Sequence, residues 1–207
     1  MEFKNDVEKV SYALGLNVAE YFRSLPYDVD FAFAAQALSD AAAGKPAIMQ
    51  DEYHATMQKF QKLMQEAAEK HMAEMAKKNK LEGDKFLAEN AKKEGVKSTP
   101  SGLQYIVITE GEGDTPTSTD IVKVHYTGTL IDGRVFDSSV SRGVPAQFGV
   151  NQVIPGWTEA LQMMKVGSKY KLFLPSDIAY GERGAGEMIQ PNSTLIFEVE
   201  LLDIIKK

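Results

Sequence analysis

Side chains suited to covalent chemistry are sparse and scattered in this sequence of 207 residues. Cysteine is absent, which excludes disulfides, thiolate catalysis and cysteine-ligated metal. The three histidines, His54, His71 and His125, do not stand at metal-ligand spacing, and no Ser-His-Asp arrangement is recognisable. The sequence therefore predicts no metal site, no cofactor and no visible means of hydrolysis, acyl transfer or redox chemistry.

A glycine-rich stretch, Gly181–Gly186, resembles a phosphate-binding loop only superficially. It contains Glu182, lacks the Gly-Lys-Ser/Thr ending, and does not open a predicted helix. We interpret it as a long surface loop.

What remains is a set of aromatic residues in the second half of the chain. They are Tyr126, Phe136, Phe148, Trp157, Tyr180 and Phe197. A packed core is the more common explanation of such a set. Two details favour a small binding pocket instead: Asp137 directly follows Phe136, and Tyr180 stands at the foot of the glycine-rich loop, where its hydroxyl would be exposed. From the residues alone both explanations stay open.

The elements around these aromatic residues follow from hydrophobic periodicity. Trp157, the chain's one tryptophan, follows a Pro-Gly break and begins a helical stripe that continues through Ala160, Leu161 and Met164. Alternating apolar residues predict strands over 103–107, 122–126, 170–174 and 195–201, and Asp132-Gly133 predicts a hairpin turn with positive φ angles. The second half is therefore predicted to be an antiparallel sheet wrapped around one short helix, an α+β fold.

The first half of the chain reads as helical. One helix is predicted to begin at Asp6 as its cap and to end before Pro26, and a second covers 29–43, with Asp28 or Asp30 as its cap. The pair carries more apolar surface than two short helices can hide from water. A second copy of the chain is the simplest partner, so we expect a dimer.

A third helix is predicted from about residue 51 to about 94. Its first half has an apolar stripe rich in methionine, whereas 77–93 is charged on nearly all sides and predicts a solvent-exposed rod. Gly83 is a candidate flex point, and whether the helix bends there stays open. Periodicity changes after the linker 97–102. We expect a helical dimerisation domain over 1–48, a connecting helix over 49–96 and a sheet domain over 97–207.

Five blocks of the second half resemble one known family, the FKBP-type peptidyl-prolyl cis-trans isomerases, over roughly residues 100–205. The blocks are Val124–Gly128, Gly133–Ser139, Val153–Trp157, Ala179–Gly181 and Thr194–Leu202. The helical half resembles the dimerisation region of the bacterial macrophage infectivity potentiator group, through Val10–Gly15 and Phe86–Ala91.

The resemblance implies an enzyme that accelerates rotation about X–Pro bonds during protein folding. Carried over by position, the implied catalytic residues are Asp137, Tyr180, Phe136, Tyr126 and Phe197, and the implied substrate-binding residues are Trp157, Val153, Ile154, Phe148, Arg142 and Ile189. The chain departs from the family at Ala146 and in the loop Gly184–Pro191, where Met188 and Gln190 are unusual. The departures bear on peptide preference and on affinity for inhibitors.

Expected partners are proline-containing peptides, unfolded or partly folded proteins, macrolide inhibitors such as FK506 or rapamycin, and a second copy of the chain. A chaperone cleft lined by Met57, Met64, Met72 and Met75 competes with the simpler explanation that these residues pack the dimer. The alternative function is a binding module with little turnover.

Net charge and hydropathy restrict the possible binding partners and the cellular location of the protein. The net charge of -6 gives no basis for binding nucleic acid or anionic membrane, and no apolar run is long enough to span a bilayer. The chain begins without the pattern of a signal peptide. A cytoplasmic location is predicted, with the periplasm or cell surface as the alternative if a signal peptide has been removed.

Overall fold

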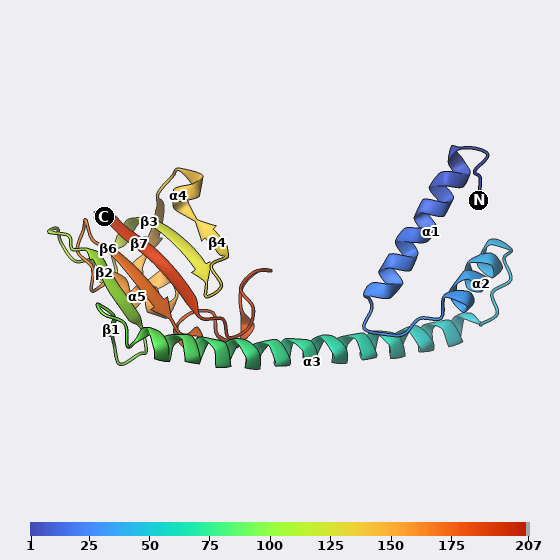
Figure 1. Cartoon of the computed structure of the whole chain (residues 1–207), viewed down its shortest axis with the longest axis horizontal. Helices are drawn as coiled ribbons and strands as arrows, with labels where there is room; N and C mark the ends of the chain where they lie inside the picture. Colours follow the sequence, from blue (N-terminus) through green and yellow to red (C-terminus); the bar gives the residue numbers. More distant parts are fainter. Residues whose placement is uncertain (206–207) are drawn as a thin grey trace. The chain divides into compact units, whose positions relative to one another are not determined.

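The computed structural model describes residues 1–205, which divide into two compact units after His71. The first unit contains α1 (Asp6–Ser24), α2 (Phe31–Ala42) and the beginning of α3 (Gln50–Asn90) (Figure 1). Of the two predicted caps of α2, Asp28 and Asp30, the structure has Asp30, whose side chain accepts hydrogen bonds from N–H groups of the first turn. The cap predicted at Asp6 is wrong: Asn5 holds that place and accepts from the Glu8 N–H at 3.0 Å. Asn and Asp are equally good caps, so composition did not separate the two.

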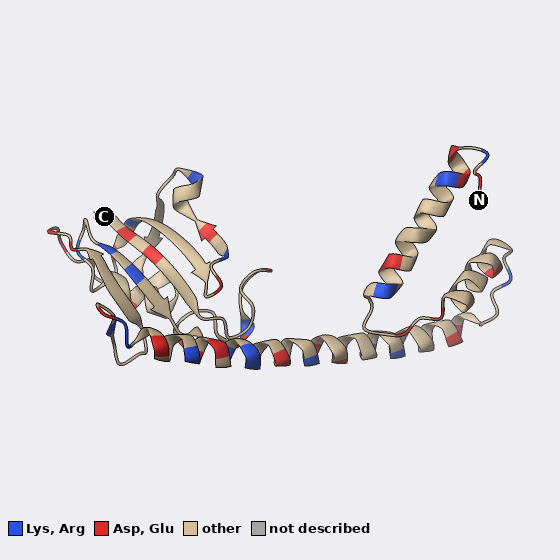
Figure 2. Cartoon of the chain, viewed as in Figure 1, with Lys and Arg blue, Asp and Glu red and all other residues tan. Residues whose placement is uncertain are grey.

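Apolar side chains cover much of the surface of α1 and α2. Within residues 6–24 and 31–42, all of which are described, no residue is buried, and Phe33 is 78% exposed. Figure 2 shows that most residues of both helices are uncharged. Exposed apolar residues in such number are typical of interaction surfaces.

The second unit is built on an antiparallel sheet that has seven strands within residues 97–205. The strands are β1 (Lys97–Ser98), β2 (Gln104–Thr109), β3 (Ile121–Leu130), β4 (Val135–Ser138), β5 (Ala146–Gly149), β6 (Lys169–Leu174) and β7 (Leu195–Ile205). Their order is β1-β2-β6-β7-β3-β4, and β5 also pairs with β3 (Figure 1). The long central pair β3–β7 supplies the register on which the site rests.

One short helix fills the concave face of this sheet. This helix is α5 (Pro155–Leu161). Its residues Trp157, Ala160 and Leu161 share a hydrophobic core with buried residues of β3, β6 and β7. A four-residue helix, α4 (Ser139–Arg142), and three 3-10 turns, η1 (Val150–Gln152), η2 (Ser176–Ile178) and η3 (Gly181–Arg183), complete the unit. The predicted α+β architecture, with its helical first half, is confirmed.

The β3–β4 turn forms where it was predicted but not in the predicted way. Gly133 has a φ of +88°, whereas Asp132 does not have a positive φ. Asp132 instead accepts a hydrogen bond from the Arg134 N–H at 3.0 Å. The aspartate therefore stabilises the turn through its side chain.

The end of α3 is not the solvent-exposed rod that its charge pattern predicted. Gly83, Leu87 and Asn90, which stand at i, i+4 and i+7, are buried. The Asn90 amide donates to the Gln104 side chain at 3.0 Å, and the Gln104 amide donates to the Leu87 carbonyl at 2.9 Å. The buried stripe escaped notice because two of its three members, a glycine and an asparagine, are not apolar.

Gly83, where the sequence left open whether the helix bends, is a point of close packing in an unbroken helix. A Cβ atom at this position would come within 2.2 Å of the Thr194 Oγ1. We predict that Gly83→Ala lowers the free energy of unfolding by about 1–3 kcal/mol, because the overlap outweighs the higher helix propensity of alanine. Urea denaturation measures this change.

Gly15 provides the matched control for that substitution. It also lies inside a helix, but a Cβ there would meet nothing within 4 Å, so Gly15→Ala should stabilise by up to about 1 kcal/mol. Adding Thr194→Ala to Gly83→Ala should recover part of the loss. Equal effects of the two glycine substitutions would contradict the packing argument.

Candidate active site

A hollow of about 440 Å³ opens beside α5 and gathers residues from six separate segments. Nine of the eleven site residues predicted above line it. They are Tyr126, Phe136, Asp137, Phe148, Val153, Ile154, Trp157, Tyr180 and Phe197. Gln152, which the sequence analysis did not single out, also lines it.

The wall and floor of this pocket are aromatic. The Trp157 ring is only 4% exposed and meets three rings nearly at right angles: Tyr126 at 5.2 Å, Phe197 at 5.2 Å and Phe148 at 5.8 Å between centroids. Phe136 packs in the same edge-to-face manner on Phe197, at 5.5 Å. Such pairs fix ring orientations. Trp157 therefore belongs to the hydrophobic core and also lines the pocket, so the two explanations left open by the sequence are both correct for this residue.

Two features of the local sequence make room for this arrangement. Pro155 opens α5 at a position where a missing N–H costs nothing, and the Trp157 N–H bonds to the Ile154 carbonyl at 2.9 Å. Gly128 in β3 lies so close to the pocket rings that a Cβ there would come within 2.5 Å of Phe136 and 2.9 Å of Phe197. Glycine in this strand therefore allows the rings to reach the pocket.

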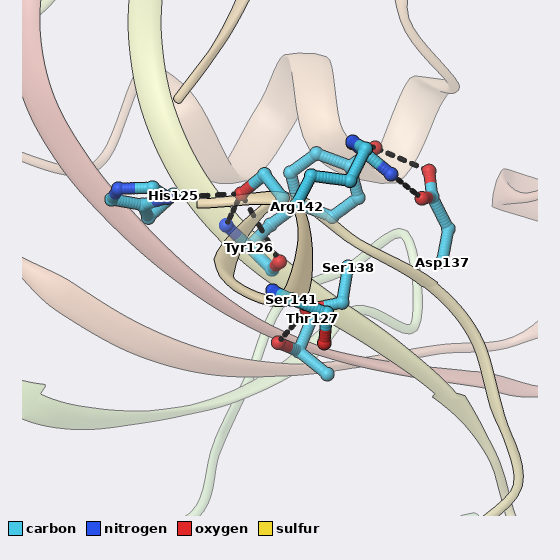
Figure 3. A network of polar contacts seen from close by, with 8 residues as sticks. His125, Tyr126, Thr127, Asp137, Ser138, Ser141 and Arg142 are labelled. Atoms are coloured by element: carbon cyan, nitrogen blue, oxygen red, sulfur yellow. Dashed lines mark hydrogen bonds and ion pairs between the residues drawn. The ribbon is translucent and has the colours of Figure 1, made fainter. Parts of the chain in front are cut away.

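One edge of the pocket is polar and tightly connected (Figure 3). The Tyr126 hydroxyl donates to one oxygen of Asp137, and the Arg142 guanidinium donates to the other. Arg142 also donates to the Tyr126 hydroxyl at 3.2 Å. Arg142 does not line the pocket itself, in contrast to the prediction; it reaches Asp137 and Tyr126 from α4.

Two serines at the junction of β4 and α4 hold this edge in place. Ser138 caps α4 and lies 2.8 Å from the Thr127 hydroxyl across the sheet. The buried Ser139 hydroxyl accepts from the Tyr126 N–H at 2.8 Å and lies 3.1 Å from His125 Nδ1 (Figure 3). The sequence analysis gave neither serine a role, because the signal is a set of contacts across the neighbouring strands β3 and β4.

The electrostatics of the site favour one charge state. Partial burial opposes ionisation of Asp137, but hydrogen bonds from Tyr126 and Arg142 and the Arg142 charge outweigh it and lower the pKa of the carboxyl. Burial, and then the bond to Asp137, raise the pKa of the Tyr126 hydroxyl. Burial and the nearby Asp137 charge likewise raise the pKa of Tyr180. At neutral pH the site therefore holds one carboxylate and two protonated phenols.

The remaining predicted residue, Ile189, lies next to the pocket. It is 8% exposed and lines an adjoining hollow together with Phe136, Asp137 and Tyr180. Tyr180 is 40% exposed, in line with its predicted place at the foot of the loop.

Comparison with known proteins agrees with this geometry. Residues 112–202 match the family described as "FKBP-type peptidyl-prolyl cis-trans isomerase", and residues 7–107 match the "Domain amino terminal to FKBP-type peptidyl-prolyl isomerase". The chain is 51% identical to the "FKBP-type 22 kDa peptidyl-prolyl cis-trans isomerase" of Escherichia coli, over 95% of both chains.

Two further relatives extend over nearly the whole chain. The "Outer membrane protein MIP" of Legionella longbeachae is 43% identical, over 97% of this chain and 87% of the relative. The crystal structure of FkpA from Escherichia coli superposes with a TM-score of 0.84 at 40% identity and covers 98% of both chains. The chain belongs to the FKBP-type peptidyl-prolyl cis-trans isomerases, a family of enzymes that interconvert the cis and trans forms of the X–Pro peptide bond.

Proposed function

We propose that the pocket above Trp157 binds the proline of a polypeptide substrate and is where the chain performs the reaction of its family. The reaction is rotation about a bond whose barrier is about 18–20 kcal/mol, so the uncatalysed exchange takes about tens to hundreds of seconds. No bond breaks and no proton has to move. A pocket with aromatic walls, whose carboxylate, Asp137, has both oxygens held by Tyr126 and Arg142, suits such a reaction, and this observation carries the proposal.

The pocket residues divide into two groups in this mechanism. Trp157, Phe136, Phe197 and Val153 hold the proline ring. The Tyr180 hydroxyl and the Ile154 N–H bind substrate carbonyl groups. The twisted amide is less conjugated and less polar than the planar one, so a dry aromatic surface stabilises it more than the ground state.

Asp137 acts on the rotating carbonyl through its charge. A carboxylate only accepts hydrogen bonds, so it does not bond to a carbonyl oxygen, and both of its oxygens are already held by Tyr126 and Arg142. We infer that it stabilises the positive carbon end of the turning carbonyl and keeps the Tyr126 hydroxyl at the pocket edge.

A coupled assay with a proline tetrapeptide tests this function on the purified protein. We predict turnover with a kcat/KM that is constant between about pH 5 and pH 9, because the pKa of Asp137 is lowered and those of Tyr126 and Tyr180 are raised away from this range. Below the plateau the rate falls as Asp137 gains a proton, and its contribution to stability is lost in the same acid range.

The same assay separates the enzyme from the alternative, a binding module. Peptide binding that changes the fluorescence of Trp157 without turnover would support the binding module. An inflection between about pH 6 and pH 7 would contradict the assigned charge states and indicate a histidine.

We further propose that α1 and α2 join two copies of the chain and that the dimer holds unfolded substrates as a chaperone. The uncovered apolar surface of both helices supports this proposal. Sedimentation of the full chain measures the dimer. We also propose that the pocket binds macrolide inhibitors such as FK506 or rapamycin, which calorimetry tests.

The compartment is also a matter of proposal. Among residues 1–205 no helix is long and apolar enough to cross a membrane. One relative is named an outer membrane protein, which supports the periplasm or cell surface over the cytoplasm. Fractionation of the source cells, followed with an antibody, tests this location.

A further inference from the structure

The surface beside the proline pocket continues across the loop that precedes β7. Phe136, Asp137 and Tyr180 line both the pocket and a second hollow of about 320 Å³. Met188 lies on the wall of that second hollow and also lines a third one, of about 210 Å³. Three hollows therefore follow one another through shared wall residues.

The loop that carries Met188 is a closed turn. Ala185 and Ile189 exchange two backbone hydrogen bonds, of 2.8 Å and 3.1 Å. Met188 stands inside this turn and is 39% exposed. Its position is therefore defined by the backbone, while its flexible side chain is free to adapt.

The far wall of the third hollow is the end of α3, which is fixed to the sheet domain. The Asn79 amide donates to the Pro191 carbonyl at 2.9 Å, and Gly83 packs against Thr194. Met75 from α3 and Leu130 and Ile131 from the end of β3 supply the apolar part of the lining.

The charged residues in this hollow are paired with one another. Lys78 lies 4.0 Å from Glu82 along α3, and Arg134 lies 2.8 Å from Asp132 in the β3–β4 turn. The hollow thus carries no net charge, and polar groups make up the larger part of its lining, beside the apolar contacts of Met75, Leu130, Ile131 and Met188. A lining that combines polar and apolar groups without net charge suits an uncharged, extended stretch of polypeptide, which has a polar backbone and apolar side chains.

We propose that the second and third hollows bind the segment of an unfolded substrate that precedes its proline; this inference rests on the proposed function of the pocket. The direction follows from Asp137. The rotating carbonyl belongs to the residue before proline, and Asp137, to which the proposed mechanism assigns this carbonyl, lines both the pocket and the second hollow. Ile154, whose N–H is assigned to a substrate carbonyl, lines the pocket but not the second hollow. The chain before proline therefore leaves the pocket toward Met188 and α3.

Peptides extended at one end test the proposal on the full-length protein. A proline tetrapeptide is compared with the same peptide lengthened by about six residues, roughly 20 Å of extended chain, either before or after the tetrapeptide. The peptide extended at its N-terminal end is expected to have a lower KM than the tetrapeptide, with little change in kcat. The peptide extended at its C-terminal end is expected to behave like the tetrapeptide.

The double variant Met75→Ala/Met188→Ala should remove most of this advantage, with about a fivefold loss in the ratio of kcat/KM values for the N-terminally extended peptide and the tetrapeptide. Met188→Ala alone changes an exposed side chain and should lose part of it. Met72→Ala is the matched control: Met72 lies on the same helix, is 49% exposed and does not line this hollow.

Several results would overturn the proposal. They are equal KM values for the two extended peptides, a ratio unchanged in the double variant, an equal loss in Met72→Ala, or weaker self-association of the double variant, which would make the hollow an interface between copies. Absence of tetrapeptide turnover in the unaltered protein would instead refute the proposed function itself.

Discussion

Replacing Asp137 by alanine is expected to lower kcat/KM for a proline tetrapeptide by about two orders of magnitude. Within residues 1–205 the carboxylate is the one charged group that lines the pocket, and it orients the Tyr126 hydroxyl there. Its contribution to stability is much smaller, about 1 kcal/mol, because Asp137 and Arg142 are both substantially exposed and solvent screens their attraction. The coupled peptide assay and urea denaturation measure the two effects separately.

Asp132→Ala is the matched control for this substitution. Asp132 also pairs with an arginine, Arg134, at 2.8 Å, and it lies on the turn at the other end of β4, outside the pocket. It should leave turnover of the tetrapeptide near its original value. Unchanged turnover in Asp137→Ala, with the fold intact, would remove Asp137 from the mechanism.

The sequence predicted the sheet well because its strands alternate with period two. Residues of β3 and β7 that were placed on one face, such as Val124, Tyr126, Val199 and Leu201, are buried together. The shorter β4 and β5 contain too few residues to show a period. α4 is a single turn, set by the Ser138 cap rather than by an apolar stripe.

The pocket was predictable only in part from the residues. Aromatic composition identified the rings, but it did not distinguish a core from a binding site, and Trp157 turned out to belong to both. The resemblance to the family supplied the remaining residues. It did not reveal that Arg142 acts from outside the pocket or that two serines fix α4, because these are contacts between residues that lie apart in the chain.

The charge pattern at the end of α3 did not predict that this segment packs against the sheet domain. Figure 2 shows many charged residues along this part of the helix, and charged residues usually indicate exposure to solvent. Leu87 and Asn90 nevertheless face the sheet domain, and Asn90 pairs with Gln104 across 14 residues of sequence. No periodicity argument finds a hydrogen bond between two buried amides.

This packing predicts a large difference between two fragments of the protein. Residues 72–207 keep the buried end of α3, whereas residues 97–207 lose it. The shorter fragment gives up the burial of Leu87, which is worth about 2 kcal/mol, and leaves the side chain of Gln104 without either of its partners, which costs about 1–3 kcal/mol more. Phe173 also loses its contact with Phe86.

We therefore expect residues 97–207 to be less stable than residues 72–207 by about 4 kcal/mol, a large part of the 5–15 kcal/mol typical of a domain. Urea denaturation of both fragments measures this difference. Equal stabilities would show that α3 contributes nothing to the sheet domain.

The fragment 72–207 is consequently the right one for testing the role of the first helices. It keeps the pocket, so it should turn over a tetrapeptide as fast as the full chain does. It lacks α1 and α2, so it should be monomeric and should speed the refolding of a proline-limited protein less than the full chain, since a tethered substrate experiences a higher effective concentration of active site. Equal refolding rates would refute a substrate-holding role for these helices. Slower refolding with residues 97–207 alone would not support that role, because loss of stability gives the same result.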